Sequence, residues 1–389
     1  MKTLVNIFDP DEPLAAYLFL KQYYAEGDRL LFIATRENRQ LLGRYASLFN
    51  LPDSQIDFIA FKRDEDSYIY ERISRRLSSR LSPQVTYWVN LAGGSRYLAL
   101  AVQHVFTQFN ARLFYVQTRE NLVVNSPFHS TDDDSPDTID PIRYRMSLDE
   151  YFRIHGLGHD LKERSHRPTR SEDDAYRVFD CFRTRRLPHR AFEALEQLRL
   201  IYRGMRKPMS IHDITFGHRD RRNAVPGLPA LINAIGFVPK EKDMLLPAEV
   251  DYLTGGWFEE YVYYTLLRLV DPQQIAIGVR IARPGTQHNN ELDVVFIKAN
   301  TLFVVECKTG IQTDHIFNEV VYKCTALNEM LLGPSSHSYI FTLKNDRDGR
   351  LSRVAASMGI TLCDKGVLAD KNRIASVCHR MVQISNERD

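Results

Sequence analysis

Two apolar, β-branched runs separated by a short polar stretch constrain the fold of this chain more than any other feature. The runs cover residues 290–296 and 302–308, and the polar residues 298–301 lie between them. This pattern is typical of a β-hairpin, in which two strands pair through a tight turn. Because side chains alternate along a strand, Glu306 and Lys308 are expected on one face of the second strand.

The hairpin also places charged groups at the ends of apolar strands. Asp293 on the first strand is expected to lie alongside Glu306 and Lys308 on the second. Two carboxylates and an ammonium group are costly to bury without a purpose. Such a group can hold a divalent metal ion and position a water molecule for attack on phosphorus. A solvated strand end would also account for Glu-x-Lys alone, and it is the upstream aspartate that favours a site.

A third element precedes the hairpin. Residues 255–262 open an apolar helical pattern, and Glu259 lies beside the apolar stripe, within reach of the hairpin. A helical glutamate, a strand aspartate and Glu-x-Lys in this order resemble the PD-(D/E)xK, restriction-endonuclease-like nucleases, although Asp293 follows leucine rather than proline. The resemblance implies that Asp293 and Glu306 are metal ligands. It also implies that Lys308 orients the water or stabilises the transition state, and that Glu259 is an auxiliary acid.

The N-terminal third of the chain alternates short apolar strands with amphipathic helices. This alternation favours a parallel, helix-covered sheet of Rossmann type, whose ligands bind where strands end and helices begin. The expected strands cover residues 4–8, 30–34, 56–60, 85–90 and 113–117, and the expected helices cover 15–24, 38–49, 68–81 and 97–109.

Two glycines fall where the fourth expected strand passes into a helix. Glycine lets backbone N–H groups approach a phosphate, and the start of a helix favours negative charge, to which Arg96 adds a cation. A Gly-Gly turn alone is commonly just a turn, but the ends of the first two strands could line the same crevice. No Gly-x-Gly-x-x-Gly or P-loop motif is present, which argues against a dinucleotide cofactor and against P-loop nucleotide hydrolysis. The candidate ligand-binding residues are Phe8, Asp9, Pro10, Thr35, Arg36, Asn90, Ala92, Gly93, Gly94, Ser95 and Arg96.

This glycine loop on a Rossmann-like sheet, ahead of a PD-(D/E)xK domain, resembles the CARF effector nucleases of type III CRISPR defence. The family often has Gly-Gly-Thr-Lys, where residues 93–96 of this chain read Gly-Gly-Ser-Arg and keep the hydroxyl and the positive charge. The resemblance implies that the N-terminal domains pair about a two-fold axis and bind a cyclic oligoadenylate, most commonly cyclic tetra-adenylate. A symmetric ring suits such a dimer, because each protomer presents the same loop to half of it.

A chain of 389 residues is too long for one ordinary core, so several units are expected. We assign residues 1–149 to the Rossmann-like CARF sensor, 150–235 to a helical connector and 236–389 to the nuclease domain. Helices are expected at residues 148–154, 191–202, 315–331 and 351–358, strands at 338–343 and 360–363, and a polar, acidic loop at 130–137.

Several smaller features complete the sequence pattern. Lys323 is expected to be an exposed helical lysine without a role, with a phosphate contact as the alternative. His155 and His159 are four residues apart, but the glycines between them argue against a metal site. Five scattered cysteines argue against a disulfide framework or zinc ribbon. An early Asp9 argues against a signal peptide, and no apolar run approaches membrane length, so we expect a soluble, cytoplasmic protein.

These expectations combine into one function, a cyclic-oligoadenylate-gated endonuclease of antiviral defence that cleaves DNA, RNA or both with Mg²⁺ or Mn²⁺. The expected partners are the activator, the nucleic acid and a second copy of the chain, with no membrane. The net charge of +2 requires any nucleic-acid surface to be local. The alternatives are an ungated restriction or repair nuclease and an inactive nucleotide-sensing regulator. The three catalytic candidates argue against inactivity, and the glycine loop favours gating.

Overall fold

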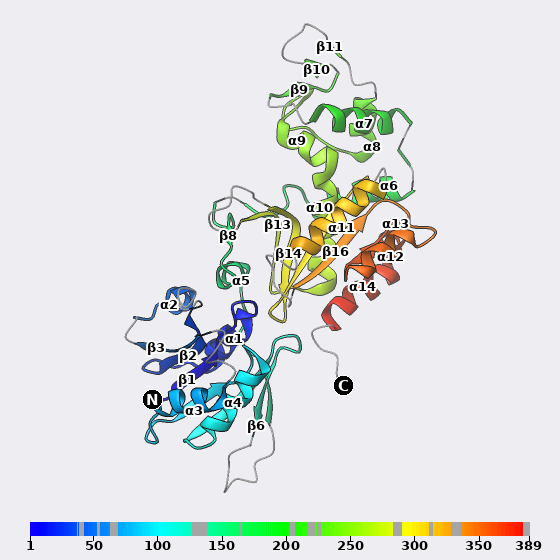
Figure 1. The fold of residues 1–389 in the computed structure, drawn as a ribbon. Coiled ribbons are helices and arrows are strands. Elements are labelled where there is room, and N and C mark those ends of the chain that lie inside the picture. The colour runs from blue at the N-terminus through cyan, green and yellow to red at the C-terminus, as the bar shows by residue number, and fades with distance from the viewer. Residues whose placement is uncertain are drawn as a thin grey trace.

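The computed structural model forms two α/β parts, each built around its own sheet (Figure 1). The expected loop at residues 130–137 lies outside the described residues, which are 1–36, 38, 43–52, 55–62, 69–126, 138–163, 165–184, 186–187, 189–202, 207–212, 214–215, 222–223, 227–282, 290–310, 314–327 and 336–383.

The N-terminal sheet has seven strands in the order β3-β2-β1-β4-β5-β6-β7, and β1 to β5 run parallel. This arrangement confirms the predicted Rossmann-like sheet. The two antiparallel edge strands β6 and β7 were not predicted. The strands are β1 (Thr3–Ile7), β2 (Arg29–Thr35), β3 (Ile56–Phe61), β4 (Tyr87–Asn90), β5 (Ala111–Gln117), β6 (Leu122–Ser126) and β7 (Thr138–Pro141). The helices are α1 (Pro13–Tyr23), α2 (Gly43–Phe49), α3 (Tyr70–Ser78) and α4 (Arg96–Phe106).

The second sheet has six strands in the order β17-β16-β15-β14-β13-β8. Its central pair is the predicted hairpin, and the turn consists of Ala299 and Asn300 with φ values of 48° and 61°. Two positive φ values in a two-residue turn match the right-handed twist of the flanking strands. The strands are β8 (Gly158–His159), β13 (Gln274–Ala282), β14 (Asn290–Lys298), β15 (Thr301–Lys308), β16 (Ser336–Thr342) and β17 (Thr361–Cys363).

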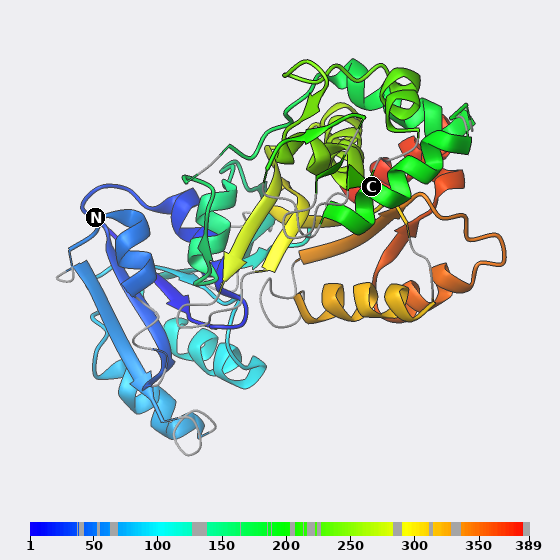
Figure 2. The same ribbon diagram turned by 90° about the horizontal axis from the view of Figure 1, so that it is seen from above.

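Helices cover both faces of this sheet, as Figure 2 shows from above. One face, which includes Phe296 and Phe303, packs against α10 and α14 in a shared core. The other face carries α11 and α12, and Phe317 of α11 shares a core there with Ile340 of β16. The helices are α10 (Trp257–Val270), α11 (Asp314–Leu327), α12 (Arg350–Ser357), α13 (Lys365–Ala369) and α14 (Lys371–Gln383).

A mainly helical segment connects the two sheets in the chain. Its apolar side chains continue the core of the second part, since Phe179 stacks on Tyr261 at 3.9 Å between ring centroids and Phe182 stacks on Trp257 at 4.7 Å. The domain boundaries predicted after residues 149 and 235 stay predictions. The core of the second part includes residues on both sides of the boundary at 235. The elements are α5 (Leu148–Ile154), α6 (Glu172–Thr184), α7 (His189–Tyr202), β9 (Met209–Ser210), β10 (Ile214–Thr215), β11 (Arg222–Asn223), α8 (Leu228–Ile235), β12 (Met244–Leu245), α9 (Pro247–Asp251) and the π-helix η3 (Tyr252–Gly256).

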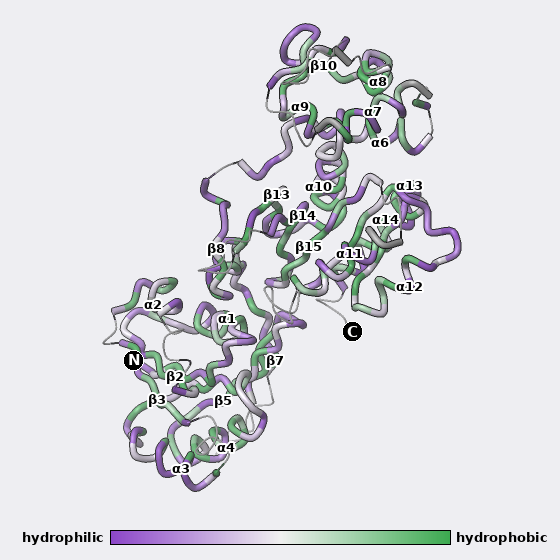
Figure 3. Tube along the Cα trace, turned by 45° about the horizontal axis from the view of Figure 1, so that its top comes forward, coloured by the Kyte–Doolittle hydropathy of each residue, from purple (hydrophilic) through white to green (hydrophobic). Residues whose placement is uncertain are grey.

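Hydropathy along the chain follows this layering, because the paired strands of both sheets are largely hydrophobic and the surface loops are hydrophilic (Figure 3). No helix in the described part of the chain combines the length and apolar character needed to cross a membrane.

The turn of the hairpin joins the two sheets. Asn300 is fully buried, and its Nδ2 donates to Oδ1 of Asn121 at 2.8 Å and to the carbonyl oxygen of Tyr144 at 2.9 Å. Its Oδ1 accepts from the backbone N–H of Met146 at 2.8 Å and from Nε2 of Gln273 at 3.2 Å. Every polar group of this side chain is therefore satisfied by residues of the N-terminal part, of the linking segment or of the turn before β13.

Candidate functional site

The ends of β14 and β15 bring together the three charged residues predicted from the hairpin. Glu306 is 2% exposed, and its Oε1 lies 2.6 Å from Nζ of Lys308. The same ammonium lies 3.3 Å from Oδ2 of Asp293, which also accepts from the backbone N–H of Cys307 at 2.7 Å. Lys308 therefore bridges the two carboxylates, and the neighbouring strand fixes the aspartate.

A second lysine reaches the same carboxylate from α11. Nζ of Lys323 lies 3.0 Å and 3.1 Å from the two oxygens of Glu306, and 3.4 Å from the carbonyl oxygen of Glu291. The prediction that Lys323 has no role is wrong. Only the packing of α11 against β15 brings this lysine to the site, and no local sequence pattern marks it.

Glu259 approaches the site from the first turn of α10, which continues directly from the π-helix η3. Burial raises the pKa of Glu259 to about 8, and the neighbouring Asp293 adds to the shift. Burial and the charge of Glu306 likewise raise the pKa of Asp293 to about 6. Both shifts reflect burial first and repulsion between neighbouring carboxylates second.

The pKa of Glu306 moves the other way. Burial alone would raise it, but the two lysines outweigh burial and lower the pKa below its ordinary value. Burial also opposes the charge on Lys308, yet the carboxylates of Asp293 and Glu306 outweigh it and raise the pKa of that ammonium. Glu306 and Lys308 are therefore held as a charged pair, and Glu259 is the carboxyl group of this cluster whose pKa is raised furthest.

The two predicted metal ligands already converge on a cation, the ammonium of Lys308. Within the described residues, no group of three or more histidine, cysteine or acidic side chains is arranged to hold a metal ion. Mg²⁺ does not need three protein ligands, because it binds one or two carboxylates and completes its coordination shell with water and phosphate oxygens. Asp293 and Glu306 therefore fit a Mg²⁺ or Mn²⁺ site that a substrate completes.

A cavity of about 880 Å³ lies beside this group. Glu259 and Lys308 line it, as do the backbones of Gly255 and Gly256. A Cβ atom added at Gly255 would meet nothing within 4 Å, so this wall of the cavity is open backbone. The cavity therefore opens onto Glu259 and Lys308, whereas Asp293 and Glu306 do not line it.

The predicted ligand loop in the N-terminal part packs tightly on the end of β1. Gly93 has a φ of 140°, and a Cβ there would lie 2.2 Å from the carbonyl oxygen of Ile7. Gly94 has a φ of 62°, and its Cβ would lie 2.8 Å from Cγ2 of Ile7. Both positions require glycine. Ser95 then caps α4, accepting at Oγ from the N–H of Leu98 at 3.2 Å, and Arg96 is exposed.

Two of the predicted ligand-binding side chains are buried and support this loop. Asn90 is fully buried, donates to Oδ1 of Asn6 at 3.0 Å and accepts from the N–H of Ala92 at 3.1 Å. Phe8 packs edge-on against Phe32 and Tyr45. Ala92 is also buried, whereas Asp9, Pro10 and Thr35 are half-buried and Arg36 is exposed. Their contact with a ligand stays a prediction.

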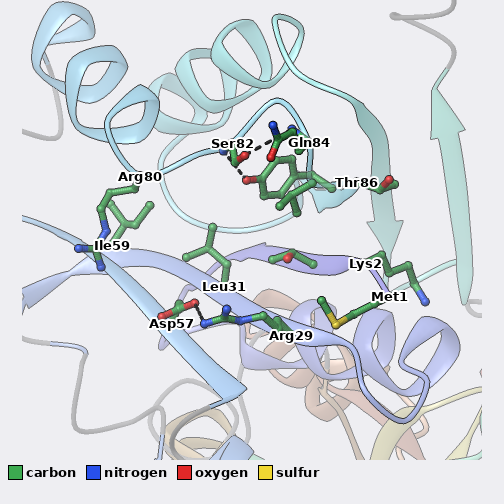
Figure 4. A pocket seen from close by; sticks show the side chains of 13 residues that line it. Met1, Lys2, Arg29, Leu31, Asp57, Ile59, Arg80, Ser82, Gln84 and Thr86 are labelled. Atoms are coloured by element: carbon green, nitrogen blue, oxygen red, sulfur yellow. Dashed lines mark hydrogen bonds and ion pairs between the residues drawn. The ribbon is translucent and has the colours of Figure 1, made fainter.

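Another cavity, of about 370 Å³, lies at the opposite, amino-terminal ends of these parallel strands (Figure 4). Its polar groups include an ion pair between Arg29 and Asp57 at 2.8 Å. None of the predicted ligand-binding residues lines it. It is therefore separate from the glycine loop.

Comparisons with known proteins address both parts. Residues 6–151 match the family described as the Card1 CARF domain, and residues 248–370 match the Card1-like endonuclease domain. The crystal structure of protein VC1899 from Vibrio cholerae is 18% identical, with a TM-score of 0.72, covering 100% of this chain and 99% of that one. Can2 from Sulfobacillus thermosulfidooxidans, solved with cyclic tetra-adenylate, is 16% identical, with a TM-score of 0.67, covering 99% and 97%.

A third solved structure is a type III CRISPR defence DNA nuclease activated by cyclic oligoadenylate. It is 15% identical with a TM-score of 0.50, and the match covers 88% of this chain and 45% of that one. No curated protein matches the sequence. At these identities, the structural likenesses show a shared fold.

Proposed function

Because the chain joins a Card1 CARF domain to a Card1-like endonuclease domain, it belongs to the CARF-domain effector nucleases, and we propose that it is a metal-dependent endonuclease gated by a cyclic oligoadenylate. One observation carries the catalytic half of this proposal. It is the bridge of Lys308 between Asp293 and Glu306, which lies inside the span matched by the endonuclease family.

The proposed chemistry is the hydrolysis of phosphodiesters in DNA, RNA or both. Asp293 and Glu306 would hold Mg²⁺ or Mn²⁺, which would supply a Lewis acid for the scissile phosphate and its attacking water. Lys308 Nζ positions that water and offsets the negative charge that develops on the phosphorus oxygens. Glu259, the carboxyl group with the raised pKa, is the auxiliary acid at the edge of the cavity.

The proposed activator site is the loop of residues 93–96. Gly94 and Ser95 are exposed where β4 meets α4, and the exposed Arg96 stands at the first turn of that helix. The likeness to Can2, which was solved with cyclic tetra-adenylate, supports that ring as the first activator to test. A two-fold dimer would place two copies of the loop around one ring.

A cleavage assay with the full-length chain tests this proposal. Supercoiled plasmid and single-stranded RNA are incubated with Mg²⁺, Mn²⁺ or EDTA, each with and without cyclic tetra-adenylate. We expect cleavage only when both metal and activator are present. Glu306→Gln should abolish cleavage and keep activator binding, while Glu241→Gln, an exposed residue outside the cavity, should behave as the parent. Equal cleavage without the activator would refute gating, and full activity of Glu306→Gln would refute the site.

A further inference from the structure

The cavity beside the catalytic carboxylates has a second wall that neither family match contains. Residues 152–247 lie between the two matched spans, and Arg167 and Arg199 from this stretch line the cavity together with Glu259 and Lys308. Arg280 from β13 lines it as well. Three guanidinium groups therefore share one cavity with the catalytic candidates.

Arg167 is an exposed side chain on an anchored backbone. On one side, His166 is buried, with Nδ1 2.9 Å from the carbonyl oxygen of Ile277. On the other side, Thr169 donates from its N–H at 2.6 Å and its Oγ1 at 2.7 Å to Oε1 of the buried Glu260. Among the described residues, Arg167 has no ion-pair partner. Its guanidinium is thus held over the cavity without a protein anion to occupy it.

Arg199 lies nearer to the catalytic strand. Its NH1 is 2.6 Å from Oε1 of Glu196, its Nε is 3.5 Å from the carbonyl oxygen of Thr254, and its side chain is 23% exposed. A Cβ atom at Gly310 would lie 3.4 Å from NH1, so this guanidinium stands beside the residue two positions after Lys308. The contact with Thr254 ties it to the π-helix that leads to Glu259.

The acidic groups that line the cavity leave Arg167 without an ion pair among the described residues, and Arg199 pairs with Glu196, which does not line the cavity. Glu260 is engaged by Thr169 and the N–H of Arg170. Arg280 makes only a loose pair with Glu291, at 3.5 Å between half-exposed side chains. Asp251 also lines the cavity, and burial raises its pKa. The arginines therefore line the cavity from elements other than the two strands that carry Asp293 and Glu306.

We propose that Arg167 and Arg199 bind backbone phosphates of the nucleic acid, so that the segment between the two domains forms the second wall of the substrate channel. This inference rests on the proposed nuclease function. A guanidinium matches a phosphate with two parallel N–H donors, and such contacts position a strand without reading its bases. The open backbone at Gly255, where an added Cβ atom would meet nothing within 4 Å, leaves room for the strand beside Glu259 and Lys308.

Binding measurements test the wall separately from catalysis. In full-length Glu306→Gln protein with cyclic tetra-adenylate, the Kd of a fluorescein-labelled single-stranded oligonucleotide is measured at several KCl concentrations, with Arg167→Ala, Arg167→Lys or Arg199→Ala added. We expect each alanine variant to weaken binding about tenfold. The slope of log K against log salt should also fall by about 0.7 for each lost phosphate contact. Arg167→Lys should retain the parent slope.

Arg380→Ala is the matched control, because Arg380 is an exposed arginine of α14 outside the cavity lining. Unchanged Kd and slope in both alanine variants, with melting temperatures equal to the parent, would overturn the inference and leave the nuclease proposal standing. Reduced slopes in both alanine variants, together with a parent chain that cleaves equally with and without the activator, would support the wall and refute gating. A parent that binds no oligonucleotide would overturn both.

Discussion

Nδ2 of Asn300 donates a hydrogen bond to Oδ1 of Asn121 across 2.8 Å, and this bond ties the catalytic hairpin to the turn between β5 and β6. Asn300 is the tip of the hairpin whose other end carries Glu306. At about 3.3 Å per residue, the six residue steps from Asn300 to Glu306 span roughly 20 Å. One continuous strand therefore runs from the contact with the N-terminal part to Glu306.

We expect Asn300→Gly to uncouple the two domains. Glycine keeps the left-handed turn, whereas losing the amide leaves buried partners unpaired, which costs about 1–3 kcal/mol of folding stability. Activator affinity should stay within twofold of the parent, and the activation of cleavage should fall at least tenfold. Calorimetric titration and a cleavage assay measure the two quantities. Asn110→Ala, far from this contact, is the control, and parental activation in Asn300→Gly would remove the turn from the coupling path.

Lys323→Met should slow cleavage by about 10- to 100-fold, the usual range for residues that orient a metal ligand. The methionine keeps the aliphatic bulk but removes the ammonium that contacts both oxygens of Glu306. Lys323→Arg should recover part of the rate. Single-turnover cleavage at saturating activator is the measurement, and a parental rate in Lys323→Met would show that Lys308 alone positions Glu306.

Arg96→Glu should weaken the binding of cyclic tetra-adenylate at least tenfold, because it places negative charge beside the proposed phosphate site at the start of α4. Cleavage at saturating activator should recover toward the parental rate. Arg112→Glu changes an exposed arginine at the opposite end of the sheet and is the charge-matched control. Equal weakening by both variants would mean that net charge, rather than this loop, governs binding.

Acid should destabilise the contact between α1 and α5 in a defined pH window. Burial alone would raise the pKa of Glu150, but hydrogen bonds from Tyr144, Tyr17 and Ser147 outweigh it and lower the pKa to about 2. The unfolded chain binds this proton more readily, so the stabilisation is complete above about pH 4.5 and is lost as pH falls toward 2.

Urea unfolding at several pH values measures this effect. Glu150→Gln should lower the free energy of unfolding by about 1–2 kcal/mol at neutral pH, after allowance for the partial exposure of Glu150. It should also reduce the loss of stability between about pH 4.5 and pH 2, which is the acid limb of the stability curve. Glu26→Gln, an exposed turn residue, should leave the curve unchanged. An unaltered acid limb in Glu150→Gln would assign the loss of stability to other carboxyl groups.

Local patterns were sufficient to predict much of this molecule. The hairpin and the meeting of Asp293 with Glu306 follow from strand alternation and a short turn, which act over a few residues. The parallel strands β1 to β5 follow from apolar runs spaced by helices. Strand β7 (Thr138–Pro141) escaped prediction because it is exposed throughout and carries no apolar alternation.

Features that depend on tertiary packing could not be predicted in this way. Lys323 and Arg199 reach the site on helices whose placement no short pattern determines. Phe8 and Asn90 lie at strand ends, where spacing does not say whether a side chain turns outward or beneath the loop. The amide of Asn300 bonds to Met146 and Asn121, each of which precedes Asn300 by more than 150 positions in the chain.

The π-helix η3 tolerates a change in residue count that the helix after it does not. Its wider turn accommodates one more residue than an α-helix does, immediately before the helix that carries Glu259. Deleting one residue from η3 would therefore close it into an α-helical turn with little rotation of α10. Deleting one residue between η3 and Glu259, where the chain is already α-helical, would instead rotate the Glu259 side chain by about 100° about the helix axis. A homologue with a one-residue gap at that point is therefore expected to be inactive, even where its motif is intact.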